Sequence, residues 1–330
     1  MTKHPKITIA VACLNEEEHV EECLNSLIAQ DYPGEFDIFV ADGGSQDRSL
    51  EIIKDFSDRY DKIKLIENLR KIQAVGRNLV FKNTDSEYLA YLDAHSYAER
   101  NWLSQLWREF AKRENKEKLG GIGSVHSAAN KNDFPFAVSQ AFNSPLGGGM
   151  QGSYSQKDEL TQVDSAYACL YKKSTLDKIG YYDENLAAGE DLELNLRIKE
   201  NGYSVYVNPK AKTNYYHKEN FQDLIEQMYR YGYWRAKVSM MRKSGSNMIY
   251  VPSIFLVLLL ATLILSFALP ILFLFFIALM IGYFLVIFTN ALSNSITHGR
   301  NMFSMAMIYP CIHFGYGFGF LRGLLGKSGS

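Results

Sequence analysis

The stretch "ITIAVACLNEEEHVEECLNSLIAQ", residues 7–30, contains the two patterns that decide the fold. Residues 7–14 form a continuous apolar, partly β-branched run, which is typical of a strand buried on both faces. Residues 15–30 predict a helix, with Asn15 at its N-cap and acidic residues in the first turn, where the helix dipole favours them. A strand that leads directly into a helix is the repeating element of an α/β fold.

The same alternation continues along the chain. Further strands are predicted at 36–42, 63–68 and 88–93, and further helices at 48–60 and about 71–83. Alternating strands and helices predict a mostly parallel sheet with helices on both faces. Ligands of such sheets bind outside the carboxyl ends of the strands, which is where Asn15, Asp42 and Asp93 fall.

The pattern changes after residue 115. Strands are predicted at 120–127, 165–174 and 203–209, a polar, glycine-rich stretch at 143–163, and helices near 190–201 and at about 219–243. We expect a first half that binds a nucleotide and a second, more irregular half that shapes an acceptor site.

Charge divides the chain into two parts. All 36 acidic residues lie in residues 1–226, together with 27 basic ones, so this part has a net charge of −9. Residues 227–330 hold eight basic residues and no acidic one. The near-neutral total therefore conceals an acidic part and a basic part.

The basic part also contains long apolar runs. Residues 248–269 and 271–288 are each near the ~20 residues that cross a bilayer core, and we expect membrane helices at about 249–269 and 271–289. A third apolar run, about 302–321, is broken by Pro310 and several glycines, and it either spans the membrane or lies in its interface.

The charges that flank the predicted spans indicate on which side of the membrane the first part of the chain lies. Five basic residues between Arg230 and Lys243 precede the first predicted span, as the positive-inside rule expects of a cytosolic flank. The opening residues do not form a secretory signal pattern. We therefore expect residues 1–243 in the cytosol, where the four scattered cysteines would stay reduced.

The first candidate for chemistry is the pair Asp93 and His95, which leaves the end of a strand. A carboxylate and an imidazole one residue apart can share a cation such as Mg²⁺ or Mn²⁺. The alternative is that Asp93 caps the next turn and His95 is solvated.

A second candidate is Asp42 in "ADGGSQD" (41–47). It can accept hydrogen bonds from a base or a ribose, while the two glycines allow a close backbone approach. An ordinary strand-to-helix turn with Asp47 as N-cap is the alternative. Arg77, in "GRN" (76–78), lies within a predicted helix.

The last two candidates lie on helices. Glu190 and Asp191 begin a predicted helix and act either as favourable first-turn charges or as a general base. Gln227, Arg230 and Tyr231 share one face of a later helix, where an arginine can clamp phosphates. That later helix is equally typical of a membrane surface.

In order and spacing these motifs resemble the family 2 inverting glycosyltransferases of GT-A fold. The series is N-E at 15–16, D-G-G-S-x-D at 42–47, G-R-N at 76–78, D-x-H at 93–95, G-E-D at 189–191 and Q-x-x-R-Y at 227–231. "YLDAHS" and "QMYRYG" look most like the membrane-bound glucosyltransferases that build succinoglycan-type exopolysaccharide. The resemblance covers about residues 6–245 and roughly the apolar hairpin.

The resemblance implies a role for each motif. Asn15, Glu16 and Asp42 would line the uridine pocket, Arg77 would approach the base or the diphosphate, and Asp93 with His95 would hold a divalent cation, Mg²⁺ or Mn²⁺, on the donor diphosphate. Asp191 matches the catalytic base, with Glu190 beside it, and Gln227, Arg230 and Tyr231 match the motif near acceptor and diphosphate. The sequence departs from the family at His95, where a second Asp is usual, and at Tyr231, where Trp is usual.

The resemblance also implies a GT-A fold, a Rossmann-like mixed, mostly parallel sheet with flanking helices, followed by C-terminal transmembrane helices. We expect a cytosolic catalytic domain at 1–218, an amphipathic basic-aromatic membrane-surface helix at 219–247, and a membrane region at 248–330. The protein would be a multi-pass protein of the cell (inner) membrane, without a nucleic-acid partner.

The implied reaction moves a sugar, glucose in the first instance, from a UDP-sugar donor to a hydroxyl of a polyprenyl-diphosphate-linked saccharide. One alternative is a polyprenyl-phosphate sugar synthase, whose acceptor is the lipid phosphate itself and which needs no general base. Another is a non-catalytic nucleotide-sugar-binding subunit. A transporter is disfavoured because no charge lies inside the apolar segments.

Overall fold

The computed structural model describes residues 4–130, 132–148, 158–242, 245–298 and 302–326. The chain divides into two compact units. The first, here called the sheet unit, comprises residues 1–129 and 151–216; the second, the helical unit, comprises residues 130–150 and 217–330. Residues 130–150, which the sequence suggested would belong to one domain with 1–218, group with the helical unit.

The sheet unit is built on one mixed sheet with the strand order β3-β2-β1-β4-β8-β6-β9-β5, and β7 pairs with β9. The strands are β1 (Ile7–Cys13), β2 (Phe36–Asp42), β3 (Ile63–Glu67), β4 (Tyr88–Asp93), β5 (Ser96–Ala98), β6 (Leu119–Ala128), β7 (Thr161–Gln162), β8 (Tyr167–Lys172) and β9 (Ser204–Tyr215). Its helices are α1 (Val20–Ile28), α2 (Ser49–Arg59), α3 (Gln73–Lys82), α4 (Trp102–Arg113), α7 (Lys173–Ile179) and α8 (Glu190–Glu200).

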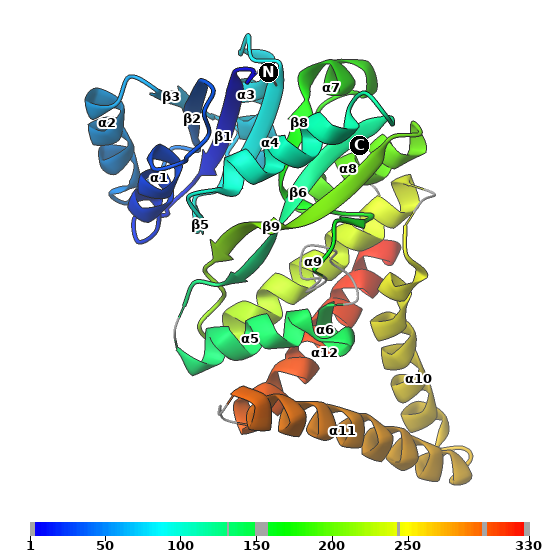
Figure 1. The fold of residues 1–330 in the computed structure, drawn as a ribbon. Coiled ribbons are helices and arrows are strands. Elements are labelled where there is room, and N and C mark those ends of the chain that lie inside the picture. The colour runs from blue at the N-terminus through cyan, green and yellow to red at the C-terminus, as the bar shows by residue number, and fades with distance from the viewer. Residues whose placement is uncertain (1–3, 131, 149–157, 243–244, 299–301, 327–330) are drawn as a thin grey trace. The chain divides into compact units, whose positions relative to one another are not determined.

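The first four strands pair in parallel, and the later ones add antiparallel neighbours (Figure 1). The predicted fold class, a mixed and mostly parallel sheet with flanking helices, is confirmed. β9 is longer than its predicted strand because it pairs with β6 along most of its length, and its last three residues also pair with β5.

The first helix begins later than its sequence pattern predicts. α1 starts at Val20 with His19 as N-cap. Asn15 instead adopts a left-handed conformation with φ of 55°, which Asn tolerates better than most residues. Its side chain accepts a hydrogen bond from the Gln46 backbone in the neighbouring loop at 2.8 Å. The prediction of Asn15 as N-cap was wrong because this longer-range contact is available to it.

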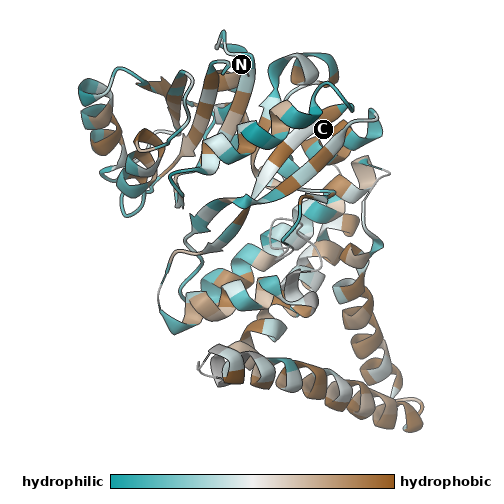
Figure 2. Ribbon diagram, viewed as in Figure 1, coloured by the Kyte–Doolittle hydropathy of each residue, from teal (hydrophilic) through white to brown (hydrophobic). Residues whose placement is uncertain are grey.

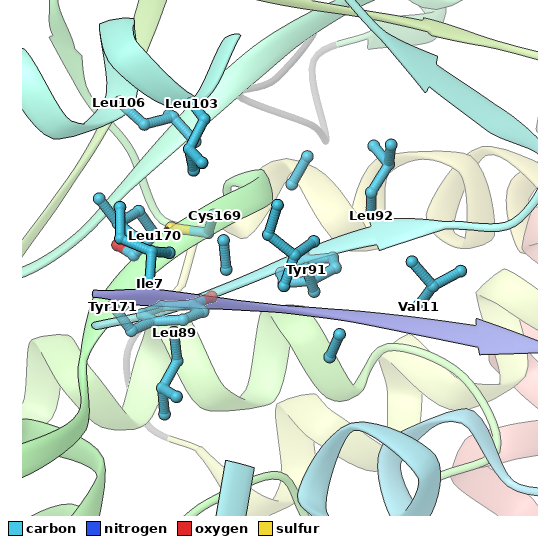
Figure 3. Packing of buried hydrophobic residues seen from close by; sticks show 14 of the residues in the cluster. Ile7, Val11, Leu89, Tyr91, Leu92, Leu103, Leu106, Cys169, Leu170 and Tyr171 are labelled. Atoms are coloured by element: carbon cyan, nitrogen blue, oxygen red, sulfur yellow. Dashed lines mark hydrogen bonds between the residues drawn. The ribbon is translucent and has the colours of Figure 1, made fainter. Parts of the chain in front are cut away.

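The core of the sheet unit surrounds β4, all of whose residues are buried. Figure 3 shows side chains of β1, β4, β8 and α4 packed together, with Tyr91 and Tyr171 among them. Both tyrosines and Trp102 of α4 are fully buried. Burying one large apolar side chain contributes about 1.5–3 kcal/mol, so burial on both faces explains the unbroken apolar run of β4.

The helical unit contains a closely packed helix pair. Its elements are α5 (Asp133–Asn143), α6 (Pro145–Gly148), α9 (Phe221–Met241), a 3-10 turn (Asn247–Tyr250), α10 (Val251–Leu265), α11 (Ile271–His298) and α12 (Met302–Leu325). α9 and α12 run side by side (Figure 1).

Glycines bring the backbones of α9 and α12 together. Gly315, Gly319 and Gly323 recur every fourth residue on α12 and face the α9 backbone. A Cβ at Gly323 would lie 2.5 Å from the Tyr233 carbonyl oxygen, and one at Gly319 would overlap that of Tyr229. Only glycine permits this approach, as in other small-residue helix contacts.

Two helical segments, Asn247–Leu265 and Ile271–Thr297, are long and apolar enough to cross a membrane by length and composition. They coincide with the two apolar runs of the sequence, and Figure 2 shows α10 and α11 as mostly hydrophobic ribbons. α12 continues as one helix through Pro310 and is not among these segments in the described part of the chain.

Candidate functional site

Two aspartates stand at the same edge of the sheet unit. β1 lies between β2 and β4, with Cys13 opposite Asp42 and Ala12 opposite Asp93. Because neighbouring strands are about 4.8 Å apart, the two aspartates lie roughly 10 Å from each other across β1. They flank the carboxyl edge at which parallel sheets bind ligands.

The loops after β1 and β2 are joined by hydrogen bonds. The backbone N–H of Asn15 donates to Ser45 Oγ at 3.0 Å, and that of Glu16 donates to Ser49 Oγ at 2.7 Å. Together with the bond from Gln46 to Asn15, these contacts fix one loop against the other. Asn15, Glu16 and Asp42 are therefore brought together on a rigid edge.

The Asp42 carboxylate stabilises the turn that follows it in the chain. Its Oδ2 accepts from the backbone N–H groups of Gly44 and Ser45 at 2.8 and 3.1 Å, and its Oδ1 accepts from Ser45 Oγ at 2.6 Å. Gly44 has φ of +75°, a conformation that side chains rarely adopt. A carboxylate offers about four lone-pair positions, so Asp42 keeps capacity for a ligand donor.

Arg77 of α3 lies at the centre of the site and is 2% exposed. Its Nη2 donates to Asp93 Oδ1 at 2.6 Å and its Nη1 donates to Glu190 Oε1 at 2.8 Å. The guanidinium stacks over the Tyr91 ring, with its carbon 4.0 Å from the ring centroid. One buried cation thus joins the end of β4 to the start of α8.

Glu190 and Asp191 are the first two residues of α8 and have different environments. Burial raises the pKa of Glu190 to about 7; the positive charge of Arg77 opposes this effect and the neighbouring Asp191 adds to it. Asp191 is only partly buried. The buried carboxylate is committed to Arg77, whereas the more open one can meet a substrate proton.

His95 is held at both ring nitrogens. Its Nδ1 lies 2.8 Å from Glu16 Oε1, and its Nε2 lies 3.0 Å from the hydroxyl of Tyr215 on β9. A proton on Nδ1 would be donated to the carboxylate, which leaves Nε2 to accept from the tyrosine. We assign this tautomer from the hydrogen-bond partners.

Asp93 and His95 could hold a divalent cation that takes its other ligands from phosphate oxygens and water. Among the described residues no three His, Cys, Asp or Glu side chains gather into a metal cluster. Mg²⁺-type sites often use one or two protein ligands and complete their shell with phosphate oxygens and water. Glu16 on the far nitrogen of His95 is the carboxylate–histidine arrangement that orients a ligating imidazole.

The remaining predicted residues lie on α9 in the helical unit. Gln227 is 9% exposed and its Nε2 donates to the Tyr231 hydroxyl at 3.4 Å, while Arg230 is exposed. The other eight predicted residues, Asn15, Glu16, Asp42, Arg77, Asp93, His95, Glu190 and Asp191, all belong to the sheet unit.

Sequence reasoning missed several residues of the site. Gln73 Nε2 donates to Asp93 Oδ1 at 2.5 Å, and its position one helical turn before Arg77 was a usable signal. Asn78 exchanges hydrogen bonds with the backbone of Tyr182, which fixes the segment before α8 against α3. Tyr182 and Tyr215 carry no local signal, because their partners lie more than a hundred positions away.

Comparisons with known proteins show the family of the chain. Residues 8–180 match the family model described as Glycosyl transferase family 2. The dolichyl N-acetyl-alpha-D-glucosaminyl phosphate 3-beta-D-2,3-diacetamido-2,3-dideoxy-beta-D-glucuronosyltransferase of Methanococcus voltae is 28% identical over 263 residues, which cover 78% of this chain and 81% of that protein. The succinoglycan biosynthesis protein ExoA of Rhizobium meliloti is 27% identical over 232 residues, which cover 69% and 68%.

One solved structure shares the fold. The mannosyltransferase PcManGT from Pyrobaculum calidifontis, in complex with GDP-Man and Mn²⁺, matches with a TM-score of 0.62 over 99% of this chain and 89% of that one. The two sequences are 14% identical, so the likeness concerns the fold alone.

Proposed function

Because the chain belongs to glycosyl transferase family 2 and is a glycosyltransferase, we propose that it transfers a sugar from a UDP-sugar to a hydroxyl of a lipid-linked saccharide. Glucose is the first donor sugar to test, and the product would serve polysaccharide biosynthesis.

The relatives support the proposed acceptor class. One is named for transfer to a dolichyl-phosphate-linked sugar, and the other for succinoglycan biosynthesis. The first of these names contains a polyprenol-type carrier, dolichol.

The observation that carries the proposal is the Arg77 bridge. One guanidinium contacts Asp93, the candidate donor ligand, at 2.6 Å and Glu190, beside the candidate base, at 2.8 Å. Inverting glycosyl transfer requires a base and a leaving-group site held at a fixed separation, because attack and departure occur on opposite faces of one carbon. A rigid, buried link between them meets this need.

In the proposed reaction Asp191 accepts the proton of the acceptor hydroxyl. An electron pair of the acceptor oxygen then forms a bond to the anomeric carbon. At the same time the bond from that carbon to the diphosphate oxygen breaks, and UDP leaves with the electrons of the broken bond. A single displacement inverts the anomeric centre. Glu190 would act through Arg77, as a positioning residue.

On the donor side, Asn15, Glu16 and Asp42 would hold the uridine, and Arg77 would position the ligand set at the diphosphate. Asp93 and His95 would hold a divalent cation, Mg²⁺ or Mn²⁺, which supplies neutralisation of the diphosphate charge. Mn²⁺ in the PcManGT complex supports this choice of cation. On α9, Gln227, Arg230 and Tyr231 would contact the acceptor and the departing diphosphate.

We further propose that α10 and α11 anchor the protein in the cell (inner) membrane, with residues 1–218 in the cytosol, 219–247 along the membrane surface and 248–330 in or at the bilayer. Their apolar length and composition support this. Lys243, part of the flanking basic run, lies outside the described residues.

The test is a donor panel. Membranes containing the full chain are incubated with UDP- and GDP-sugars, with Mn²⁺, with Mg²⁺ and with a chelator. We expect transfer from a UDP-sugar to a lipid-extractable product only when a cation is present. No transfer and no donor hydrolysis under any condition would refute the proposal.

A further inference from the structure

Gln73, the first residue of α3, has a side-chain amide with one atom bound and the other open. Its Nε2 donates to Asp93 Oδ1 at 2.5 Å. The amide is assigned this way round because the carboxylate, which is paired with Arg77, only accepts hydrogen bonds. Gln73 Oε1 accepts from no residue that the structure describes, and it is not among the buried side-chain atoms that lack a partner. This oxygen therefore reaches solvent and remains for a ligand.

The Asp93 carboxylate shows the same division between its two oxygens. Oδ1 accepts from Gln73 at 2.5 Å and from Arg77 at 2.6 Å. Oδ2 accepts from no residue in the described part of the chain, and it too is absent from the buried atoms that lack a partner. Two side chains that are hydrogen-bonded to each other thus each keep one acceptor oxygen at the carboxyl edge of the sheet.

The amide of Gln73 is held by a rigid partner. Gln73 and Arg77 are four residues apart, so α3 directs both donors to Asp93 from one face. Arg77 is buried and also holds Glu190 at 2.8 Å, which leaves the Asp93 carboxylate little freedom to move. A side chain that is already fixed loses less conformational freedom when it binds a ligand. The open oxygen of Gln73 is therefore preorganised.

The chemistry of this oxygen selects a neutral donor. An amide oxygen accepts hydrogen bonds and carries no net charge, whereas Mg²⁺-type sites are completed by carboxylates, phosphate oxygens and water. Under the proposed function a nucleotide sugar lies along the edge between Asp42 and Asp93. Its ionised phosphates carry no donor, so apart from the base its hydrogen-bond donors are the hydroxyls of its two sugars.

We propose that Gln73 is a donor-binding residue whose Oε1 accepts a hydrogen bond from a sugar hydroxyl of the nucleotide sugar, while its Nε2 positions Asp93. The hydroxyl belongs either to the ribose or to the transferred sugar. This inference rests on the proposed function, because it takes a nucleotide sugar as the ligand. It assigns to Gln73 the recognition of a hydroxyl rather than of a charge.

The experiment compares ligands that differ in their hydroxyls. The full chain, purified in detergent with Mn²⁺, is titrated by calorimetry with UDP, 2′-deoxy-UDP, 3′-deoxy-UDP and UDP-glucose. If the hydroxyl belongs to the ribose, one deoxy nucleotide should bind about five- to tenfold more weakly than UDP, because it leaves the acceptor unpaired. If the hydroxyl belongs to the transferred sugar, UDP-glucose should instead bind more tightly than UDP by a similar factor.

A substitution at Gln73 locates the effect. Gln73→Met keeps the length of the side chain but removes its donor and its acceptor, so the difference in affinity between the two ligands of the responding pair should disappear. Damage to the site alone would weaken both ligands in parallel and preserve that difference. Gln105→Met, at a half-buried glutamine of α4, is the matched control and should preserve it as well.

The inference is overturned if the wild type shows no difference in either pair, or if Gln73→Met retains the full wild-type difference. Should Gln73→Met fail to fold, Gln73→Asn withdraws the amide by one methylene group. It should lose the difference in the same way, and a retained difference in this variant would also exclude the contact. If the wild type binds neither UDP nor UDP-glucose, the proposed function fails, and this inference fails with it.

Discussion

Arg77 and Glu190, 113 positions apart in the sequence, meet at 2.8 Å in the interior of the sheet unit. Because the same guanidinium holds Asp93 at 2.6 Å, the end of β4 and the start of α8 cannot move independently. The geometry of the candidate site therefore depends on one side chain that is itself almost inaccessible to substrate.

Replacing Arg77 with Met should destabilise the sheet unit severely. It leaves two buried carboxylates without their cation, a loss of about 3–5 kcal/mol in unfolding free energy. Denaturant unfolding followed by the fluorescence of buried Trp102 and Trp107 measures it. Arg70→Met is the control: Arg70 pairs with Glu184 at the surface, where a salt bridge contributes about 1 kcal/mol or less. Equal losses in the two variants would contradict the central role of Arg77.

The raised pKa of Glu190 predicts a pH dependence of stability. Its pKa is about 7 in the folded protein against an ordinary value of 4.5, so the folded state binds the proton more tightly. The resulting stabilisation is complete below about pH 4.5 and is lost as the pH rises through about 7. Relative to Glu190→Gln, the wild-type thermal midpoint should therefore fall between pH 5 and pH 8. Parallel profiles of the two proteins would show that Glu190 does not titrate in this range.

Asp191→Asn should abolish transfer while leaving donor binding intact. Loss of a general base typically lowers the rate about 10²–10⁴-fold. Turnover is measured with the donor identified by the panel, and UDP binding by calorimetry. Asp55→Asn, at an exposed carboxylate of α2 that pairs with Arg59, should leave both quantities unchanged. Substantial turnover in Asp191→Asn would favour attack by a lipid phosphate, which needs no base.

Substitutions at His95 and at Tyr215 should have opposite effects on cation binding. His95→Ala removes a proposed ligand and should weaken Mn²⁺ binding in the presence of UDP. Tyr215→Phe frees Nε2 of His95 from its 3.0 Å hydrogen bond and should strengthen Mn²⁺ binding, provided that Glu16 still orients the ring. Mn²⁺ electron paramagnetic resonance counts free and bound cation directly. Unchanged Mn²⁺ affinity in His95→Ala would remove this residue from the ligand set.

The glycines of α12 can be tested by matched substitutions to Leu. Gly319→Leu would force the α9 and α12 backbones apart, and we expect a fall in thermal midpoint of several degrees or a failure to accumulate. At Gly282 of α11 a Cβ meets nothing within 4 Å, so Gly282→Leu should be neutral or slightly stabilising through its better helix propensity. If both variants melt alike, the close approach of the two helices contributes little.

Much of the sheet unit follows from local patterns. The four parallel strands were predictable because each is a short, mostly apolar segment that alternates with a helical pattern. Asp42 and Asp93 could be placed because polar residues at the ends of parallel strands meet at one edge. Glu190 and Asp191 could likewise be placed at a helix start. Each of these predictions needs only the pattern of a few neighbouring residues.

What the sequence did not disclose depends on contacts between distant segments. The Arg77 bridge and the Tyr215 contact to His95 join segments more than a hundred positions apart. Asn15 failed as an N-cap because a loop from another strand offered its side chain a better partner. The glycines of α12 were noted only as interruptions of an apolar run, and only the fold shows that they face α9.

The close contact of α9 with α12 also constrains the order of events during synthesis. α9 ends at Met241 and its partner begins at Met302, so α9 emerges from the ribosome well before the surface that will cover it. The apolar hairpin of α10 and α11 is synthesised in that interval and, under the proposed anchoring, inserts into the membrane then. The helical unit therefore assembles late, after α12 has been synthesised. In a nascent chain that stalls before Gly319, α9 would remain uncovered and accessible to chaperones and proteases.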